Sequence, residues 1–254
     1  MQSGLDGHVM TLLVLVKQVP IPEEPSGMEM NRFDEYAVEE ALRIRELFPG
    51  VQVHVMTLGP EGAGKVVKRA LGMGADAGIH VITPENEFPG SALTAARAAA
   101  AINNHAYDLI LTGILSQDRM EGQVGPLMAE YLGIPCAVGV VETALDPEDG
   151  SIRVEREMEA GFRDCISMRL PAVLAVQAGI NRPRYPSLSH VLAAGKKTVH
   201  LVRASDLPGA PFAETQHILD LIPPEKTRAG VFVNGTCRDK AEELLHVLQQ
   251  RGVI

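Results

Sequence analysis

The chain has no tryptophan, only 4% aromatic residues and a deficit of basic charge. Of its 254 residues, 23 are Lys or Arg and 32 are Asp or Glu, which gives a net charge of −9. Proteins that bind nucleic acids hold the phosphate backbone with clustered Lys and Arg. No basic stripe is present here, so we expect no nucleic-acid partner.

Long apolar runs are also missing. The longest run near the start, residues 9–16, is too short to span a bilayer, and no small-residue cleavage pattern follows it. We therefore expect a cytoplasmic protein that does not span a membrane.

Cysteine is scarce and histidine is scattered. Cys136, Cys165 and Cys237 are far apart and form no CxxC pair, so neither a disulfide framework nor a zinc site is indicated. We interpret all three as buried apolar residues. None of the eight histidines forms an HxxxH motif or pairs with a cysteine, which argues against a metal site and a hydrolase triad. We predict no catalytic residue.

The first half of the chain alternates strand and helix. Nearly half of all residues are hydrophobic, which predicts a sizeable core. Short apolar runs are followed by amphipathic segments four times; the predicted strands are residues 9–16, 51–58, 79–82 and 109–111. This order predicts an α/β protein with a doubly wound, mostly parallel sheet and ligands at the carboxyl ends of its strands.

The pattern changes after residue 135. Strand-like runs joined by turn residues predict antiparallel hairpins added to the parallel core, at residues 136–141, 152–158, 162–168 and 172–177. Residues 180–197 resemble a Pro-punctuated loop, and a helix is predicted at residues 239–250. We expect an α/β nucleotide-binding domain at residues 8–202, and a C-terminal arm and helix at 203–254 that reach toward a partner.

The segment 107–135 combines a strand, a Gly-bounded polar loop and a helix that begins with Gly-Pro. Backbone N–H groups around residues 123–125 would point outward with the positive end of the helix dipole behind them, and a phosphate could bind there without Lys or Arg. An ordinary connection between a strand and a helix explains the same residues, and the segment alone does not decide.

Two further segments allow a binding and a structural interpretation. GPEGAGK, residues 59–65, has the spacing of a phosphate-binding P-loop, but Val66 follows where that motif needs Ser or Thr for magnesium, so we favour an ordinary turn. NRFD, residues 31–34, directly precedes a helix, so Asn31 or Asp34 is by default its N-cap, although the same loop could lie over a nucleotide.

Glu155 and Glu157 flank Arg156 on a predicted strand. Paired carboxylates can serve acid/base chemistry, but alternate strand residues face the same side and repel when both are charged. We favour a solvated hairpin face with Arg156 opposite.

Taken together, these segments resemble the β subunits of electron-transfer flavoproteins. The similarity runs from about Leu12 to the C-terminal helix, and its order and spacing are specific. It is carried by VLVKQVP, NRFDEYAVEEALR, ALGMGAD, LILTG, GQVGPLMAEYLGIP, VEREMEAG, LPAVLAV and INRPRYPSL followed by KK.

The resemblance implies a fold similar to adenine nucleotide alpha-hydrolases and a heterodimer whose α subunit carries the FAD. It also implies an adenine-nucleotide site in this chain, holding AMP in the common type. The implied site residues are Leu15, Asn31, Arg32, Phe33, Asp34, Leu58, Ser116, Gln117, Asp118, Arg119, Met120, Glu121, Gly122, Gln123, Val124, Gly125, Pro126 and Leu127.

Two implied partner contacts lie outside that set. Glu157 would meet an Arg of the α subunit near its flavin, and Leu188 would dock into an acyl-CoA-type dehydrogenase that donates electrons. Electrons would pass on to a quinone-linked oxidoreductase. Ala193 replaces a Lys that many members carry in this region.

The nucleotide loop leaves the ligand open. Its ending, Gln-Val-Gly-Pro, is similar to electron-bifurcating members, which oxidise NADH and hold a second FAD at this site, but Arg119, Met120 and Glu121 stand where those members usually have Asp-Gly-Asp-Thr-Ala. The resemblance therefore implies an electron carrier with AMP or, alternatively, a bifurcating subunit with FAD. A stand-alone adenine-nucleotide-binding domain is a further alternative.

Overall fold

The computed structural model describes residues 9–21, 24, 26–102, 107–208, 219, 222, 230 and 232–254. The chain divides into two compact units, Met1–His217 and Ile218–Ile254. The predicted domain bounds, residues 8–202 and 203–254, and the proposed arm around a partner stay predictions. Most of the irregular stretch predicted at residues 204–228 lies outside the described residues.

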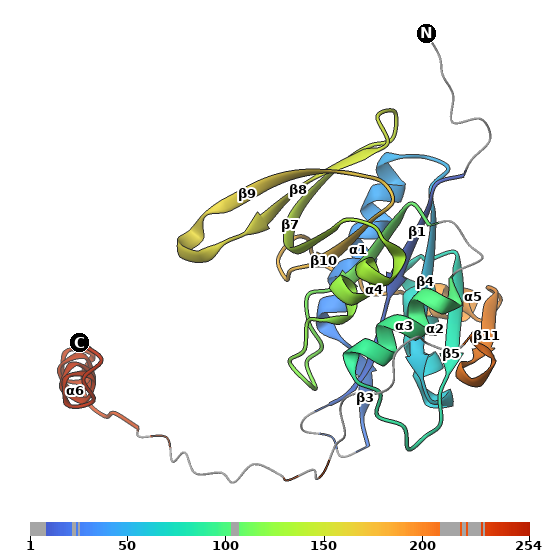
Figure 1. The fold of residues 1–254 in the computed structure, drawn as a ribbon. Coiled ribbons are helices and arrows are strands. Elements are labelled where there is room, and N and C mark those ends of the chain that lie inside the picture. Colours follow the sequence, from blue (N-terminus) through green and yellow to red (C-terminus); the bar gives the residue numbers. More distant parts are fainter. Residues whose placement is uncertain are drawn as a thin grey trace. The chain divides into compact units, whose positions relative to one another are not determined.

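The larger unit is built on a sheet with the strand order β11-β5-β4-β1-β6-β10-β7-β8-β9 (Figure 1). All neighbours from β11 to β7 are parallel, while the pairs β7–β8 and β8–β9 are antiparallel. The strands are β1 (Thr11–Leu15), β4 (Gln52–Gly59), β5 (Ala77–Ile82), β6 (Leu109–Gly113), β7 (Cys136–Asp146), β8 (Ser151–Glu157), β9 (Arg163–Arg169), β10 (Ala172–Val176) and β11 (Val199–Arg203).

Helices cover both faces of the parallel part, as the strand–helix alternation predicts. The helices of this unit are α1 (Arg32–Leu47), α2 (Gly64–Met73), α3 (Ser91–Ala101), α4 (Val124–Leu132) and α5 (Leu188–Ala194). The apolar clusters place α1, α2 and α5 on one face and α3 and α4 on the other, where they lie side by side (Figure 1). The predicted doubly wound α/β fold is confirmed.

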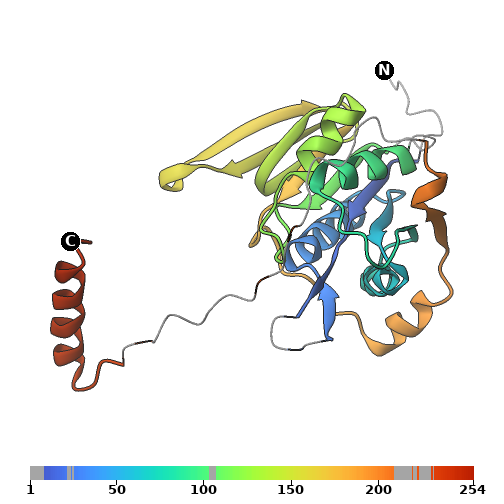
Figure 2. The same cartoon turned by 60° about the horizontal axis from the view of Figure 1, so that its bottom comes forward.

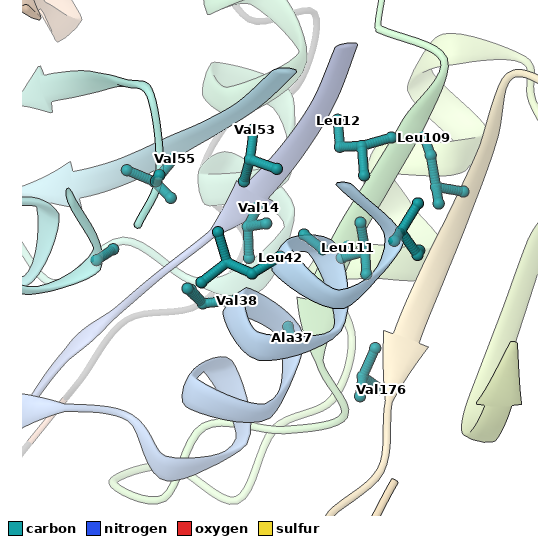
Figure 3. Close-up of a cluster of buried hydrophobic side chains, with 14 of the residues drawn as sticks. Leu12, Val14, Ala37, Val38, Leu42, Val53, Val55, Leu109, Leu111 and Val176 are labelled. Carbon is teal, nitrogen blue, oxygen red and sulfur yellow. The ribbon is translucent and has the colours of Figure 1, made fainter. Parts of the chain in front are cut away.

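Strand β1 shows why both faces are filled. Leu12 and Val14 belong to the cluster beneath α1, whereas Leu13 and Leu15 belong to the cluster beneath α3 and α4. Successive strand side chains point to opposite faces, so a central strand of a parallel sheet must be apolar throughout. Figure 3 shows Leu42 of α1 against Val14 and the neighbouring strands.

The second half of the sheet only partly follows the sequence prediction. The ribbon β7–β8–β9 is antiparallel, as expected, and extends away from the helices (Figure 2). The expectation that β10 also forms an antiparallel hairpin is wrong, because it lies between β6 and β7 and is parallel to both. Its five residues are all buried, which is typical of a strand in the interior of a parallel sheet.

Three short elements were not predicted. Residues around Pro20 were expected to be loop, but β2 (Gln18–Pro20) and β3 (Met28–Met30) form a small antiparallel pair. The expected loop at residues 180–197 contains α5, which starts at an N-cap where the Ser187 hydroxyl accepts a hydrogen bond from His190 N. Only the flanks of this helix are loop.

The expectation of buried cysteines is wrong for two of the three. Cys165 lies on the outer strand β9 and Cys237 begins the C-terminal helix, and both are exposed. Cys136 is half-buried, and burial raises the pKa of its thiol to about 11. The sequence pattern did not distinguish a strand at the sheet edge from one in the interior.

The smaller unit contains α6 (Cys237–Gln250), close to the predicted helix at 239–250. Thr236 and Asp239 form a capping box in which each side chain bonds the other residue's backbone N–H. No helix in the described part of the chain is long and apolar enough to cross a membrane.

Replacing Leu42 by Ala should lower the free energy of unfolding by about 2–5 kcal/mol, because Leu42 is fully buried and a cavity would remain. Leu47→Ala is the matched control on the same helix; Leu47 is 72% exposed, and its loss should change stability by less than about 0.5 kcal/mol. Urea unfolding measures both. Equal costs for the two variants would contradict the position of α1 over the core.

Candidate functional site

The order in which the strands are added to the sheet reverses next to β1. The chain proceeds from β1 to β4 and β5 on one side, and β6 then pairs with β1 on the other side. In doubly wound sheets, ligands bind at the carboxyl ends of the strands beside such a switch point. Leu15, Leu58 and Gly113 lie at or near the carboxyl ends of the three adjacent strands. Two of the predicted nucleotide residues, Leu15 and Leu58, therefore lie at the expected edge of the sheet.

The Asp34 carboxylate joins three segments at this edge. One oxygen, Oδ2, accepts from the backbone N–H of Lys17 at 2.7 Å, just beyond β1. The other, Oδ1, accepts from Gly113 N at 3.1 Å, at the end of β6, and from Asn31 Nδ2 at 2.9 Å. A Cβ at position 113 would lie 2.4 Å from Asp34 Oδ1, so only Gly allows this approach.

Asn31 extends the network into the loop after β6. Its Nδ2 also donates to Leu115 O at 2.9 Å, and its Oδ1 accepts from Gln117 N at 3.1 Å. Asn31 is the N-cap residue of α1, as the default interpretation allowed, but its side chain makes no capping bond. The backbone N–H of Arg32 donates to Gln117 Oε1 at 2.7 Å, which is a further bond between the start of α1 and the loop after β6.

Burial raises the pKa of Asp34 from its ordinary value of 3.8 to about 7. The hydrogen bonds from Lys17, Asn31 and Gly113 act in the opposite direction, since N–H donors favour the ionised carboxylate, but desolvation is the larger effect.

The loop after β6 is tightly closed on itself. Ser116 N donates to Glu121 O at 3.0 Å, and Met120 N donates to Ser116 O at 2.7 Å. Met120 has a φ of 54°, an unusual conformation for a residue other than glycine, and its side chain is exposed. The loop is thus a compact turn with Met120 at its tip.

Three charged side chains fix this turn to its surroundings. Asp118 pairs with Lys17 Nζ at 2.8 Å, beyond the end of β1. Arg119 donates to Pro89 O at 2.9 Å, and Glu121 accepts from Ser91 Oγ at 2.7 Å, both at the start of α3. The loop is therefore held between β1 and α3.

The first turn of α4 provides backbone donors at the same edge. Pro126 has no N–H and Leu127 N bonds Gln123 O, while no side chain caps the helix, so the amides of Val124 and Gly125 are the donors that an anion could use. The buried hydroxyl of Thr112 has no hydrogen-bond partner among the described residues. A Cβ at position 125 would lie 2.8 Å from that hydroxyl.

This edge offers several groups that an anion such as a phosphate could use. An unpartnered buried hydroxyl costs free energy unless a ligand or water satisfies it, and here it lies beside helix N–H groups that favour negative charge. Sequence reasoning missed Lys17 and Thr112, although VLVKQVP and LILTG contain them. Only their position beyond or at the end of a predicted strand could have indicated them.

The predicted nucleotide residues converge on this edge, whereas the two predicted partner residues lie elsewhere. Leu15 is buried, Phe33 and Leu58 are half-buried, and Gly122 is exposed. A Cβ at position 122 would lie 2.5 Å from Ile114 O. Ligand binding by these residues stays a prediction.

The P-loop-like segment is a turn between β4 and α2. Residues 61–63 form one turn of 3-10 helix, and Gly62 O accepts from Gln18 Nε2 at 3.1 Å. Val66, at the magnesium-binding position of the motif, is buried in the core. This geometry agrees with the preferred interpretation as an ordinary turn.

The antiparallel ribbon carries its charges in pairs. Glu155 bonds Arg163 at 2.9 Å, and Arg156 bonds Asp164 at 2.9 Å across β8 and β9. Glu157 is exposed at the end of β8. The solvated face is as expected, and the partner of Arg156 is a carboxylate of the next strand.

The fold and this edge define a doubly wound α/β protein with a candidate anion-binding site at its switch point. A family model described as "Electron transfer flavoprotein domain" matches residues 21–207. The chain therefore belongs to the electron transfer flavoprotein family, as its motifs predicted.

Relatives of similar length carry the name "Electron transfer flavoprotein subunit beta". The protein from Thermoanaerobacterium thermosaccharolyticum is 33% identical over 267 residues, which cover 96% of this chain and 100% of the relative. The Bacillus subtilis protein is 31% identical (95% and 93% covered), and the human protein is 32% identical (89% and 86% covered). The chain is thus similar to electron transfer flavoprotein beta subunits over nearly its whole length.

Asp34→Asn should change how stability depends on pH. Because the folded state raises the pKa of Asp34, it binds a proton more tightly than the unfolded chain between about pH 4 and 7, and the free energy of unfolding contributed by Asp34 falls as pH rises through this window. The stability of the unmodified chain relative to the variant should fall by at most about 1.4 kcal/mol per pH unit.

Urea unfolding at pH values from 4 to 8 measures this difference. Above about pH 7 the difference should become constant. A difference that is independent of pH, or that rises with pH, would contradict the raised pKa.

Proposed function

We propose that this chain binds an adenine nucleotide at the switch-point edge and forms a heterodimer with an FAD-carrying α subunit. The dimer would carry electrons from acyl-CoA-type dehydrogenases to a quinone-linked oxidoreductase. The similarity to beta subunits over nearly the full length supports the carrier role. The observation that carries the nucleotide site is the unpartnered Thr112 hydroxyl beside the first turn of α4.

Different residues of this chain would bind the phosphate and the adenine of the nucleotide. The amides of Val124 and Gly125 and the hydroxyl of Thr112 would hold a phosphate, and the backbone at Leu15 and Leu58 would border the adenine. Backbone recognition requires close approach rather than a particular side chain. AMP is our first choice of ligand, and FAD in the same site is the alternative.

The flavin supplies the one-electron chemistry, and this chain contributes position and electrostatics. Glu157 is exposed at the end of β8, where it is accessible to an Arg of the partner subunit. Leu188 begins α5 and is 76% exposed, which suits an apolar anchor for a dehydrogenase. Neither the contact of Glu157 nor that of Leu188 requires a catalytic residue in this chain. A cytoplasmic location of the protein stays a prediction.

The second candidate is a subunit of an electron-bifurcating protein. Its support is the Gln-Val-Gly-Pro sequence at the start of α4, which is similar to that subgroup. In that case the same edge would hold a second FAD, and NADH would be oxidised.

The purified heterodimer should contain one FAD and one AMP, because a single flavin suffices for a carrier. Absorption spectroscopy of the intact dimer and chromatography of the released nucleotides measure this ratio. NADH should leave the flavin spectrum unchanged, while an acyl-CoA dehydrogenase with its substrate should bleach it. Two FAD per dimer and bleaching by NADH would instead establish the bifurcating type. A flavin-free monomer that hydrolyses ATP would overturn both.

Thr112→Val should weaken AMP binding to the intact dimer about tenfold, because one hydrogen bond to a charged phosphate is lost. Stability without nucleotide should not fall, because the Thr112 hydroxyl has no protein partner in the described part of the chain. Thr57→Val is the matched control: Thr57 is also buried and without a partner among these residues, but alternation along β4 places it on the face of α1 and α2. Calorimetric titration that shows equal losses for both variants, or none for Thr112→Val, would remove Thr112 from the site.

A further inference from the structure

Residues 180–187 cross the outer side of α1 before the chain enters α5, and we call this segment the strap. Two α1 carboxylates, Glu39 and Glu40, lie beneath it and are each only 5% exposed. Charged side chains are rarely so buried unless they are paired. Glu39 pairs with Arg184 of the strap, whereas Glu40 bonds Asn181 of the strap, Thr143 of β7 and Arg43 of α1 itself.

Arg184 forms the main attachment. Its backbone N and its Nε donate to Glu39 Oε2 at 3.0 and 2.8 Å, and its Nη2 donates to Glu39 Oε1 at 2.8 Å. Its Nη1 donates to Glu46 Oε1 at 2.6 Å, about two helix turns further along α1. These bonds raise the pKa of Arg184, and they fix both the backbone and the planar guanidinium at this point.

Asn181 forms a second attachment at the other end of the strap. Its Nδ2 donates to Glu40 Oε2 at 2.9 Å and to Tyr36 O at 3.0 Å. The second oxygen of Glu40 accepts from Thr143 Oγ1 at 2.7 Å, so this carboxylate also connects α1 to β7. The strap is therefore held by two buried carboxylates that are adjacent in sequence.

Beyond Arg184 the strap is held against α2. The Arg69 guanidinium lies 5.2 Å from the centre of the Tyr185 ring and bonds Glu35 at 2.6 Å. Pro186 is buried, and both it and Val191 lie close to Gly72, where a Cβ would meet them at 3.4 Å. The backbone leading to Leu188 is thus fixed on two helices.

Large apolar side chains nevertheless point outward at the end of this fixed segment. Tyr185 is 83% exposed, Leu188 76% and Leu192 69%. Ordering a flexible loop on binding costs free energy, whereas an anchor on an already ordered backbone avoids most of that cost. Buried ion pairs under the strap are a means of such ordering.

We propose that Glu39 and Arg184 are positioning residues that hold Leu188 in the orientation required for docking the electron-donating dehydrogenase. This inference rests on the proposed function. It adds that docking depends on an ion pair that lies between α1 and the strap and does not itself need to touch the partner.

The test uses the intact heterodimer as electron acceptor for an acyl-CoA dehydrogenase. Glu39→Gln combined with Arg184→Met removes both charges together, so that no buried carboxylate is left unpaired. The KM for the heterodimer should rise about tenfold, with the maximal rate unchanged, since the anchor loses its order but the flavin is untouched. Hydrogen exchange of the amides in residues 185–195 should accelerate.

A double-mutant cycle separates positioning from general stability. Leu188→Ala alone should raise KM, and adding the Glu39→Gln/Arg184→Met pair to it should raise KM by less than about twofold more, because the strap acts through Leu188. Arg45→Met is the matched control: Arg45 also lies on α1 and bonds Gly74 O and Asp76, neither of which belongs to the strap. Its KM should equal that of the unmodified dimer even if its stability falls.

The outcomes are distinct. An unmodified dimer that no acyl-CoA dehydrogenase reduces contradicts the proposed function, and the docking role of the strap fails with it. A normally reduced dimer whose strap variant keeps its KM contradicts only the positioning role, as do strap and Leu188 effects that simply add. Exchange that does not accelerate would overturn the ordering of residues 185–195 by Glu39 and Arg184.

Discussion

The binding edge depends on the Asp34 carboxylate. The backbone N–H of Lys17, just beyond β1, and that of Gly113, at the end of β6, both donate to this one buried side chain. Parallel strands β1 and β6 would otherwise leave an open crevice at this point. The first turn of α1 closes it, so the proposed nucleotide site lies further out, at the loop after β6 and the start of α4.

Helix α1 connects this edge to a distant surface. Its first turn contributes Asp34 to the switch point, its middle contributes the buried carboxylates Glu39 and Glu40, and its apolar face, including Leu42, packs on the sheet. One helix thus contacts the switch point, the strap and the apolar face of the sheet. Its buried acids would be costly if they were unpaired, and their donors come from the strand ends at the switch point and from the strap.

Periodicity predicted the repeated strand–helix units well, because a central strand such as β1 is apolar on both faces and a covering helix on one. It failed for β10, since an apolar run of five residues is the same whether its neighbours are parallel or antiparallel. Capping rules placed Asn31 at the start of α1 but did not predict its side-chain bonds, because the partners Leu115 and Gln117 are 84 and 86 residues away. Local capping rules cannot anticipate such partners.

The loop from Ser116 to Gly122 illustrates how a change in sequence is accommodated. Arg119 and Glu121 are fixed at the start of α3 by Pro89 O and Ser91 Oγ, and the turn between them places Met120 outward. The three residues that distinguish this loop, Arg119, Met120 and Glu121, are therefore compatible with a loop that the surrounding protein holds in one conformation.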